Sequence, residues 1–171
     1  MEKMLLLLLW CMTSIAAANA QKFALIDMEY IMENIPAYQE ANKVLSSLSE
    51  QYQKTIETKA KEAETLYLAY QKASATLSAS QRTQKEEAIV SKEKEAAELR
   101  KKYFGPDGEL AQKQEELIVP IQDQIYNAVK LISQQKGYDA VIDRASATSI
   151  IFASPRIDIS NEVLSKLGYS N

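Results

Sequence analysis

The chain has 171 residues, a net charge of −3 at neutral pH, one cysteine and no histidine. It therefore lacks the usual ligands of zinc sites, cysteine nucleophiles and histidine general bases, so we expect neither an enzyme nor a cofactor or metal. The acidic balance also argues against nucleic acid as a partner.

The first twenty residues have the pattern of a targeting segment. Lys3 precedes an apolar stretch over residues 5–17, and Ala18-Asn19-Ala20 is an A-x-A cleavage site. This pattern predicts an exported protein that is cleaved after Ala20. The alternative is a lipoprotein signal with Cys11 as the modified residue, which the bulky Trp10 before it disfavours.

The next elements are short. Phe23-Ala24-Leu25-Ile26 is an apolar run of strand length, and it predicts a buried strand. Residues 28–34 predict a short helix that stops near Pro36, because the residue before a proline is pushed out of the α region.

Residues 37–104 contain neither glycine nor proline. One continuous helix of that length would measure about 100 Å, whereas a globular domain of this size is about 35–40 Å across. The segment is therefore predicted to project as a coiled-coil arm. Apolar residues follow one stripe at steps of three and four: Ala41, Leu45, Leu48, Tyr52, Ile56, Ala60, Ala63, Leu66, Tyr70, Ala73 and Leu77.

A turn is predicted near residues 76–81, where the arm has no charge and is rich in serine. Ser78 and Gln81 have the spacing of a capping box, which would begin a second helix and fold the arm into a hairpin. An unbroken helix is the alternative. The returning helix carries a matching stripe at Ile89, Lys92, Ala96, Leu99 and Tyr103.

Gly105-Pro106-Asp107-Gly108 must interrupt the returning helix. Because glycine tolerates positive φ, Gly105, Pro106 and Gly108 are candidates for a hinge, with a fixed turn as the alternative. A helix restarts at Leu110 and ends at Gly137.

Two runs near the end of the chain, residues 138–143 and 149–153, are strand-like and predict a hairpin. A last helix is expected over residues 161–166. The fold class is thus α+β, mostly α, with an arm over residues 39–109 and a discontinuous body over residues 21–38 and 110–171.

The predicted body is small and has no disulfide, so oligomerisation is the expected source of stability. Its apolar strands are near-continuous, which favours burial on both faces. The residues expected at the subunit interface are Phe23, Leu25, Ala140, Ile142 and Ile151.

Distinctive segments lie before and after the predicted charged hairpin, toward the two ends of the chain. They are Glu29-Tyr30-Ile31, Pro36-Ala37-Tyr38, Gly137-Tyr138-Asp139-Ala140-Val141-Ile142-Asp143 and Asp158-Ile159-Ser160. With the leader, this order resembles the Skp/OmpH family of periplasmic chaperones over essentially the whole chain after residue 20. The resemblance implies a homotrimer whose three arms hang like the legs of a jellyfish around a cavity. It also implies that unfolded outer-membrane proteins are held there in the periplasm without ATP.

The best-known members of that family are strongly basic, whereas this chain is acidic, so contact with membrane or lipopolysaccharide stays open. The family binds clients over a surface, and no single client-binding residue is predicted. Two other functions compete with the holdase: a coiled-coil spacer or assembly factor of the cell envelope with one specific partner, and an exported hydrolase using serine or carboxylates.

Overall fold

The computed structural model describes residues 21–147 and 149–169, and the predicted leader with its cleavage after Ala20 lies outside them. The chain folds as two compact units. The body unit holds the described residues up to Ile31 and from Asn127 onward, and the arm unit holds Met32–Tyr126. This division differs from the sequence boundaries at 38/39 and 109/110. Helix α5 (Glu109–Lys136) runs unbroken past residue 110 and contributes to both units.

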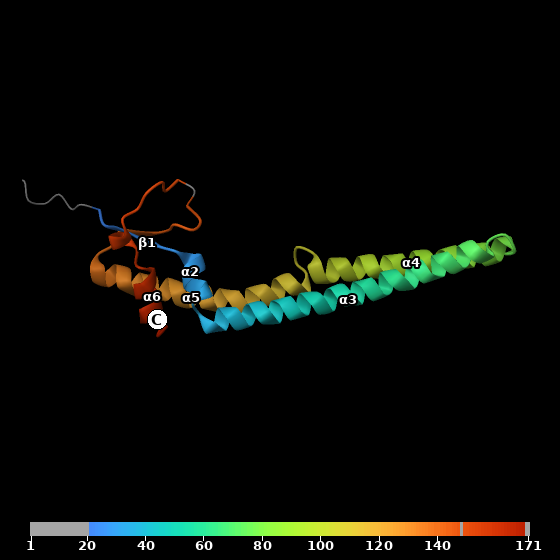
Figure 1. Cartoon of the computed structure of the whole chain (residues 1–171), viewed down its shortest axis with the longest axis horizontal. Helices are drawn as coiled ribbons and strands as arrows, with labels where there is room; N and C mark the ends of the chain where they lie inside the picture. The colour runs from blue at the N-terminus through green and yellow to red at the C-terminus, as the bar shows by residue number, and fades with distance from the viewer. Residues whose placement is uncertain (1–20, 148, 170–171) are drawn as a thin grey trace, which may run out of the picture. The chain divides into compact units, whose positions relative to one another are not determined.

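Two short parallel strands from opposite ends of the chain form the centre of the body unit (Figure 1). β1 (Phe23–Ile26) pairs with β2 (Ala140–Asp143), in a register that sets Phe23 against Ala140 and Leu25 against Ile142. Leu25 also forms a parallel bridge with Asp158. The buried apolar residues of this unit are Ala24, Leu25, Ile26, Ile31, Ala128, Ile132, Ile159, Val163 and Leu164.

Side-chain hydrogen bonds hold the start of α2, and one of them comes from a distant segment of the chain. At the start of α2 (Met28–Glu33), the amide of Tyr30 donates to Asp27 Oδ1 at 2.9 Å and the amide of Met28 donates to Asp143 Oδ1 at 3.1 Å. The predicted short helix before Pro36 is thereby confirmed.

The end of the chain forms η2 (Pro155–Ile157) and α6 (Ser160–Lys166). Asp158 Oδ1 accepts from the amide of Ser160 at 2.9 Å, and the amide of Asp27 donates to Ser160 Oγ at 2.9 Å. The helix expected over residues 161–166 is confirmed.

The predicted strand hairpin near the end of the chain is wrong. Residues 140–143 form β2, but its partner is β1, and residues 149–153 are not a strand. The chain turns directly after β2, where the amide of Ala145 donates to Asp143 Oδ1 at 3.1 Å and Ser146 Oγ donates to Asp143 O at 3.2 Å. The apolar run at residues 149–153 pairs with no strand among the described residues of this chain. Ile151 and Phe152 are 101% and 86% exposed.

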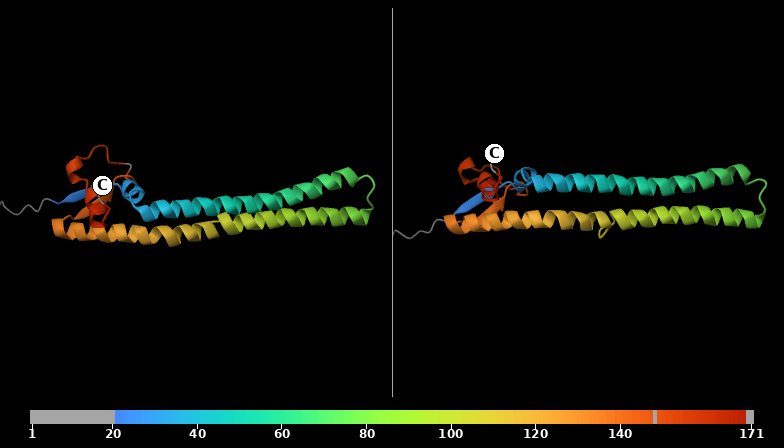
Figure 2. Two further views of the ribbon diagram at one scale, coloured as in Figure 1. Left: turned by 60° about the horizontal axis from the view of Figure 1, so that its bottom comes forward. Right: turned by 90° about the horizontal axis from the view of Figure 1, so that it is seen from below.

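The arm unit contains two long antiparallel helices (Figure 2). α3 (Pro36–Ala73) starts with proline in its first turn, where the missing amide costs nothing. α4 (Ala79–Phe104) starts after Ser78, and the predicted capping box is confirmed: Ser78 Oγ accepts from the amide of Gln81, and the Gln81 side chain accepts from the amide of Ser78. The arm is therefore a hairpin, and the continuous-helix alternative is excluded.

The stripe between α3 and α4 follows the predicted spacing with one correction. Ile56, Ala63 and Ile89 are buried, as expected for the contact face. Ala60, however, is exposed, and Lys59 takes the half-buried position beside it. A step of three from Ile56 to Lys59 and of four to Ala63 keeps the heptad spacing, whereas the predicted stripe passed through Ala60.

The first part of α5 belongs to the arm unit and lies alongside the start of α3 in both views of Figure 2. Ile121 and Ile125 are buried there. The helix runs through Pro120 and ends at Gly137, whose φ of 69° is the left-handed conformation that glycine adopts at helix ends. Within the described ranges, no helix is long and apolar enough to cross a membrane.

Candidate binding surface on the arm unit

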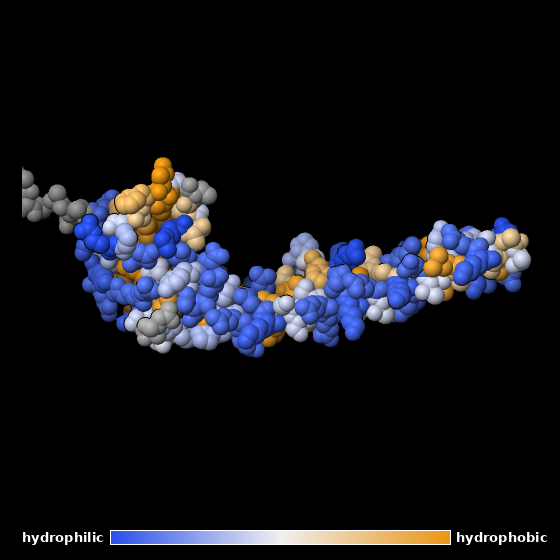
Figure 3. Space-filling model, viewed as in Figure 1, coloured by the Kyte–Doolittle hydropathy of each residue, from blue (hydrophilic) through white to orange (hydrophobic). Residues whose placement is uncertain are grey.

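The surface of the arm unit mixes apolar and charged side chains without forming a deep pocket. In Figure 3, hydrophobic residues are scattered along it between hydrophilic ones. Large apolar side chains that are 38% to 47% exposed come from all three helices: Val44, Tyr67, Leu68, Val90, Phe104 and Val119. These side chains lie at the surface and are available for shallow contacts.

A shallow groove of ≈ 430 Å³ follows one side of the contact between α3 and α4. Its floor is made by Ala60 and Ala63 from α3 and by Ala96 and Ala97 from α4, because alanine leaves space where a leucine would fill it. Tyr67 lines one end of the groove. Charged residues at its rim are Glu64, Glu93 and Arg100. The groove can take apolar side chains while the charges beside it stay hydrated.

The opposite side of the hairpin carries a second hollow, of ≈ 550 Å³. Thr58, Lys61, Thr65 and Leu66 line it from α3, and Lys92 lines it from α4. The aliphatic parts of the lysine side chains and the methyl groups of the threonines supply apolar area next to charged groups. Both faces of the hairpin thus offer weak, adaptable contact area rather than one specific site.

Four charges join the two helices between these hollows. Lys92 Nζ lies 3.1 Å from Glu62 Oε2 and 3.0 Å from Glu95 Oε2, and Lys59 Nζ lies 3.3 Å and 3.6 Å from the same two atoms. The hydrogen bond from Lys92, followed by that from Lys59, holds the pKa of Glu62 below its usual value. Hydrogen bonds to Glu95 and Glu62 raise the pKa of Lys92. Glu62 and Lys92 therefore stay charged at neutral pH, and the network links α3 to α4.

Sequence reasoning placed Lys92 on the contact face but missed the network. The available signal was a lysine followed three residues later by a glutamate on each helix, at Lys59–Glu62 and Lys92–Glu95. Such pairs are common on solvated helices, so the pattern alone did not indicate that the two pairs face one another.

The residues expected at a subunit interface are divided between core and surface of the body unit. Leu25 is 4% exposed and belongs to the core. Phe23, Ile142 and Ile151 are 45%, 39% and 101% exposed, and Ala140 is also exposed. These four residues are accessible to a partner, whereas Leu25 supports the strand from within.

The break between α4 and α5 is a closed turn. The amide of Gly105 donates to Lys101 O and the amide of Gly108 donates to Gly105 O, each at 2.9 Å, and Pro106 occupies the position where proline favours such a turn. The expectation of positive φ here is wrong, since Gly137 and Gly168 are the described glycines with positive φ.

Glycine is needed at the break for a steric reason. A Cβ at Gly105 would lie 2.3 Å from Lys101 O, and one at Gly108 would lie 2.8 Å from Tyr103 O. Alanine at either position would therefore push the turn apart rather than stiffen it.

A hollow of ≈ 360 Å³ in the body unit is lined by Leu25, Tyr30, Arg144 and Asp158 among others. Arg144 there bridges two carboxylates, with Nη2 3.1 Å from Asp27 Oδ2 and Nε 3.4 Å from Asp158 Oδ2. These ion pairs link three segments of the body unit and give the arginine a structural role. Among the described residues, no group of three or more acidic side chains is placed to hold a metal ion.

The chain is similar to known proteins in sequence and in fold. The family model of the outer membrane protein (OmpH-like) family matches residues 22–167. The chain belongs to the OmpH-like family. This OmpH-like protein is 26% identical over 152 residues to the chaperone protein Skp of Yersinia enterocolitica, with 89% of each chain covered.

A solved structure shares the fold of this OmpH-like protein. It is an OmpH-like outer membrane chaperone of Caulobacter crescentus, with a TM-score of 0.67 and 10% identity, covering 88% of this chain and 86% of that one. The resemblance to the Skp/OmpH family is confirmed, and with it the mostly helical α+β fold with a long hairpin. The family is one of periplasmic chaperones.

Proposed function

We propose that this protein is an ATP-independent holdase that binds unfolded outer-membrane proteins in the periplasm and prevents their aggregation before membrane insertion. The observation that carries the proposal is the surface of the arm unit. One alanine-floored groove, a second shallow hollow and half-exposed apolar side chains lie there among charges. Such a surface gives many weak contacts that shield an unfolded chain and leave it mobile. The relative named chaperone protein Skp supports the same role.

The holdase would act as a homotrimer joined through the body units, with the client between three arms. Phe23, Ile142 and Ile151 support this assembly, because they expose large apolar side chains on or beside the strands. A monomer would leave this area in water, whereas an oligomer would bury it. The periplasmic location rests on the leader ending at Ala20 and on the family.

A shortened arm tests the proposal. Tyr70 Oη donates to Glu86, and Glu62 pairs with Lys92. Residues of α3 and α4 that lie at equal distances from the turn therefore face one another. Deleting residues 57–70 together with residues 86–99 removes two heptads from each helix and shortens the hairpin by about 21 Å, while the native turn is kept. We expect this variant to keep its assembly state but to lose its protection of a urea-diluted outer-membrane barrel protein, measured by light scattering without nucleotide.

A second variant keeps the length of the arm. Replacing Tyr67, Leu68 and Val90 by serine removes exposed apolar area without touching the buried stripe, so holding should weaken while helicity stays the same. The matched control replaces Gln51 and Gln53, which are exposed polar residues of α3 and line neither hollow, by serine.

Full protection by the shortened chain would exclude the arm as the binding element. Purification from the native envelope distinguishes the holdase from a coiled-coil spacer with one specific partner. A range of outer-membrane barrel proteins bound to the chain supports the holdase, and one folded partner at fixed stoichiometry would instead establish the spacer.

A further inference from the structure

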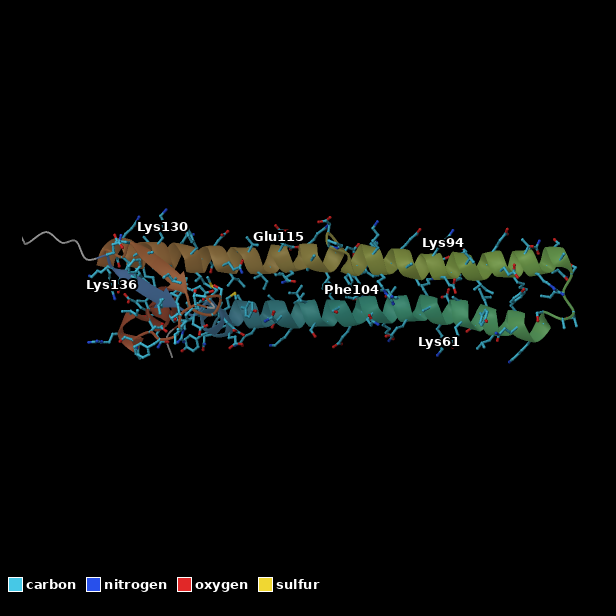
Figure 4. The ribbon with its side chains drawn as sticks, turned by 90° about the horizontal axis from the view of Figure 1, so that it is seen from above. Lys61, Lys94, Phe104, Glu115, Lys130 and Lys136 are labelled. Carbon is cyan, nitrogen blue, oxygen red and sulfur yellow. The ribbon has the colours of Figure 1, made fainter. Side chains whose placement is uncertain are left out.

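One side chain of α3 spans the break between α4 and α5. The Tyr52 ring stacks on Tyr103, in the last turn of α4, with centroids 3.9 Å apart and an interplanar angle of 3°. It also meets Phe104 edge-on at 6.2 Å and 87°. The Tyr52 hydroxyl donates to Glu109 Oε2 at 2.8 Å, and Glu109 is the first residue of α5. Figure 4 marks Phe104 at this junction.

The same carboxylate is held from the other side of the break. Lys102 Nζ of α4 lies 3.1 Å from Glu109 Oε1, so both carboxylate oxygens are engaged. The hydrogen bond to Glu109 and burial raise the pKa of the Tyr52 hydroxyl, and the hydrogen bonds from Tyr52 and Lys102 lower the pKa of Glu109. The donor therefore stays neutral and the acceptor stays charged at neutral pH, which favours a charge-assisted hydrogen bond.

These contacts are not required by the turn itself. The turn is closed by backbone hydrogen bonds at Gly105 and Gly108, and Gln112 Nε2 adds a bond to Asp107 O at 2.9 Å. A four-residue connection without a continuous helical ladder leaves α4 and α5 free to bend relative to one another, unless something outside the turn holds both. Among the described residues of α3, Tyr52 has a side chain that contacts both α4 and α5.

We propose that Tyr52 is a latch that closes a hinge at Gly105–Gly108, with aromatic stacking on α4 as one half and the hydrogen bond to Glu109 on α5 as the other. While both halves are engaged, α4 and α5 are held against α3 as one rigid stretch. When either half is lost, the bend at the break becomes variable. The arm thus contains a two-state element whose stiffness depends on a side chain of the opposite helix. This inference concerns the conformation of the chain and holds whether or not the proposed holdase function does.

Intrachain distances across the break test the latch. Lys94 on α4 and Glu115 on α5 are exposed and point away from α3 (Figure 4), so spin labels at Lys94→Cys and Glu115→Cys would not disturb the contacts. The full chain would carry Cys11→Ser, which removes its single native cysteine. Dilution with unlabelled chains restricts pulsed electron resonance to distances within one chain.

We expect one narrow distance distribution for the parent chain, and a broader one with a second, shifted population for Tyr52→Leu and for Glu109→Ala. Glu116→Ala is the matched control, because Glu116 is likewise an exposed glutamate of α5 that pairs with a lysine, but its partner Lys113 lies on the same helix rather than across the break. Its distribution should equal that of the parent.

Circular dichroism first checks that each variant keeps its helix content. If Tyr52→Leu loses helicity, Tyr52→Phe decides, since it removes only the hydroxyl that donates to Glu109 and leaves the stack and the Lys102–Glu109 ion pair intact; an unchanged distribution in Tyr52→Phe would then overturn the latch. An unchanged distribution in Glu109→Ala, or an equal broadening in Glu116→Ala, would overturn the latch.

Discussion

Ile56 is the position at which the stability of the hairpin can be measured most directly. Its side chain is 2% exposed on the contact face of α3, and it lines the groove whose floor is alanine. Replacing it with alanine removes three carbon atoms from the contact between α3 and α4. The backbone is unaffected, because alanine is the best helix former.

The expected cost follows from burial. Three buried carbon groups are worth about 2.4 kcal/mol at 0.8 kcal/mol each. Isoleucine-to-alanine changes in closed cores cost about 2–5 kcal/mol, where the upper end reflects an empty cavity. Ile56 borders an open groove that water can enter, so the lower end applies. The better helix propensity of alanine offsets a few tenths of a kcal/mol. The net loss should be about 2 kcal/mol, which corresponds to a roughly 30-fold higher opening constant.

Hydrogen exchange followed by mass spectrometry can locate this loss. Since the arm and body are separate compact units, peptides covering residues 50–63 and 89–103 should exchange roughly 30-fold faster, while peptides from β1 and β2 should be unchanged. Val44→Ala is the matched control, because Val44 is a β-branched residue of the same helix that is 40% exposed. Its effect should stay within about 0.5 kcal/mol.

Equal exchange in the Ile56→Ala and Val44→Ala chains would refute this reasoning. It would mean that packing between α3 and α4 does not stabilise the arm, and that the hairpin is held by other parts of the assembly. Faster exchange in the strand peptides as well would show that the two units unfold together.

Three further outcomes follow from the described contacts. Phe23→Asp combined with Ile142→Asp should dissociate the proposed trimer, since burying each side chain is worth about 1.5–3 kcal/mol. Light scattering coupled to gel filtration measures the mass, and an intact trimer at micromolar concentration would contradict the interface. The lowered pKa of Glu109 means that its contacts with Tyr52 and Lys102 stabilise the arm above the ordinary glutamate pKa and are lost as pH falls through the lowered value. Exchange near the break, corrected for the intrinsic exchange rate at each pH, should therefore accelerate only below about pH 4.3, and such acceleration between pH 7 and 5 would count against it. Glu62→Lys should lower the urea midpoint of the arm, and Lys92→Glu in the same chain should recover part of the loss; no recovery would show that the two charges do not interact.

Several features of the arm could be predicted from the sequence because their causes are local. The absence of glycine and proline between residues 37 and 104 favours helix, and the spacing of Ile56, Ala63 and Ile89 defines the buried face. The capping box at Ser78 and Gln81 depends on residues three positions apart, so it too could be identified in advance.

The structure corrected the predictions that depended on distant partners. Residues 138–143 have the composition of a strand, but the sequence favoured pairing with residues 149–153, which are close in the chain. The pairing with β1 joins residues more than a hundred positions apart, and no local pattern distinguishes it. The same holds for Lys59, whose place on the contact face is stabilised by Glu95 of the other helix.

The sequence by itself determined the type and period of the helices, the position of the turn and the family, because these rest on backbone propensity and on ordered local motifs. Only the tertiary structure decided which strand pairs with β1, why glycine is needed at the break, and that Tyr52 contacts both sides of it. Glycine at Gly105 and Gly108 is compatible with either a positive φ or a close backbone approach, and the distances between atoms are what distinguish the two. Contacts between segments far apart in the chain depend on register and side-chain geometry, which a one-dimensional pattern does not contain.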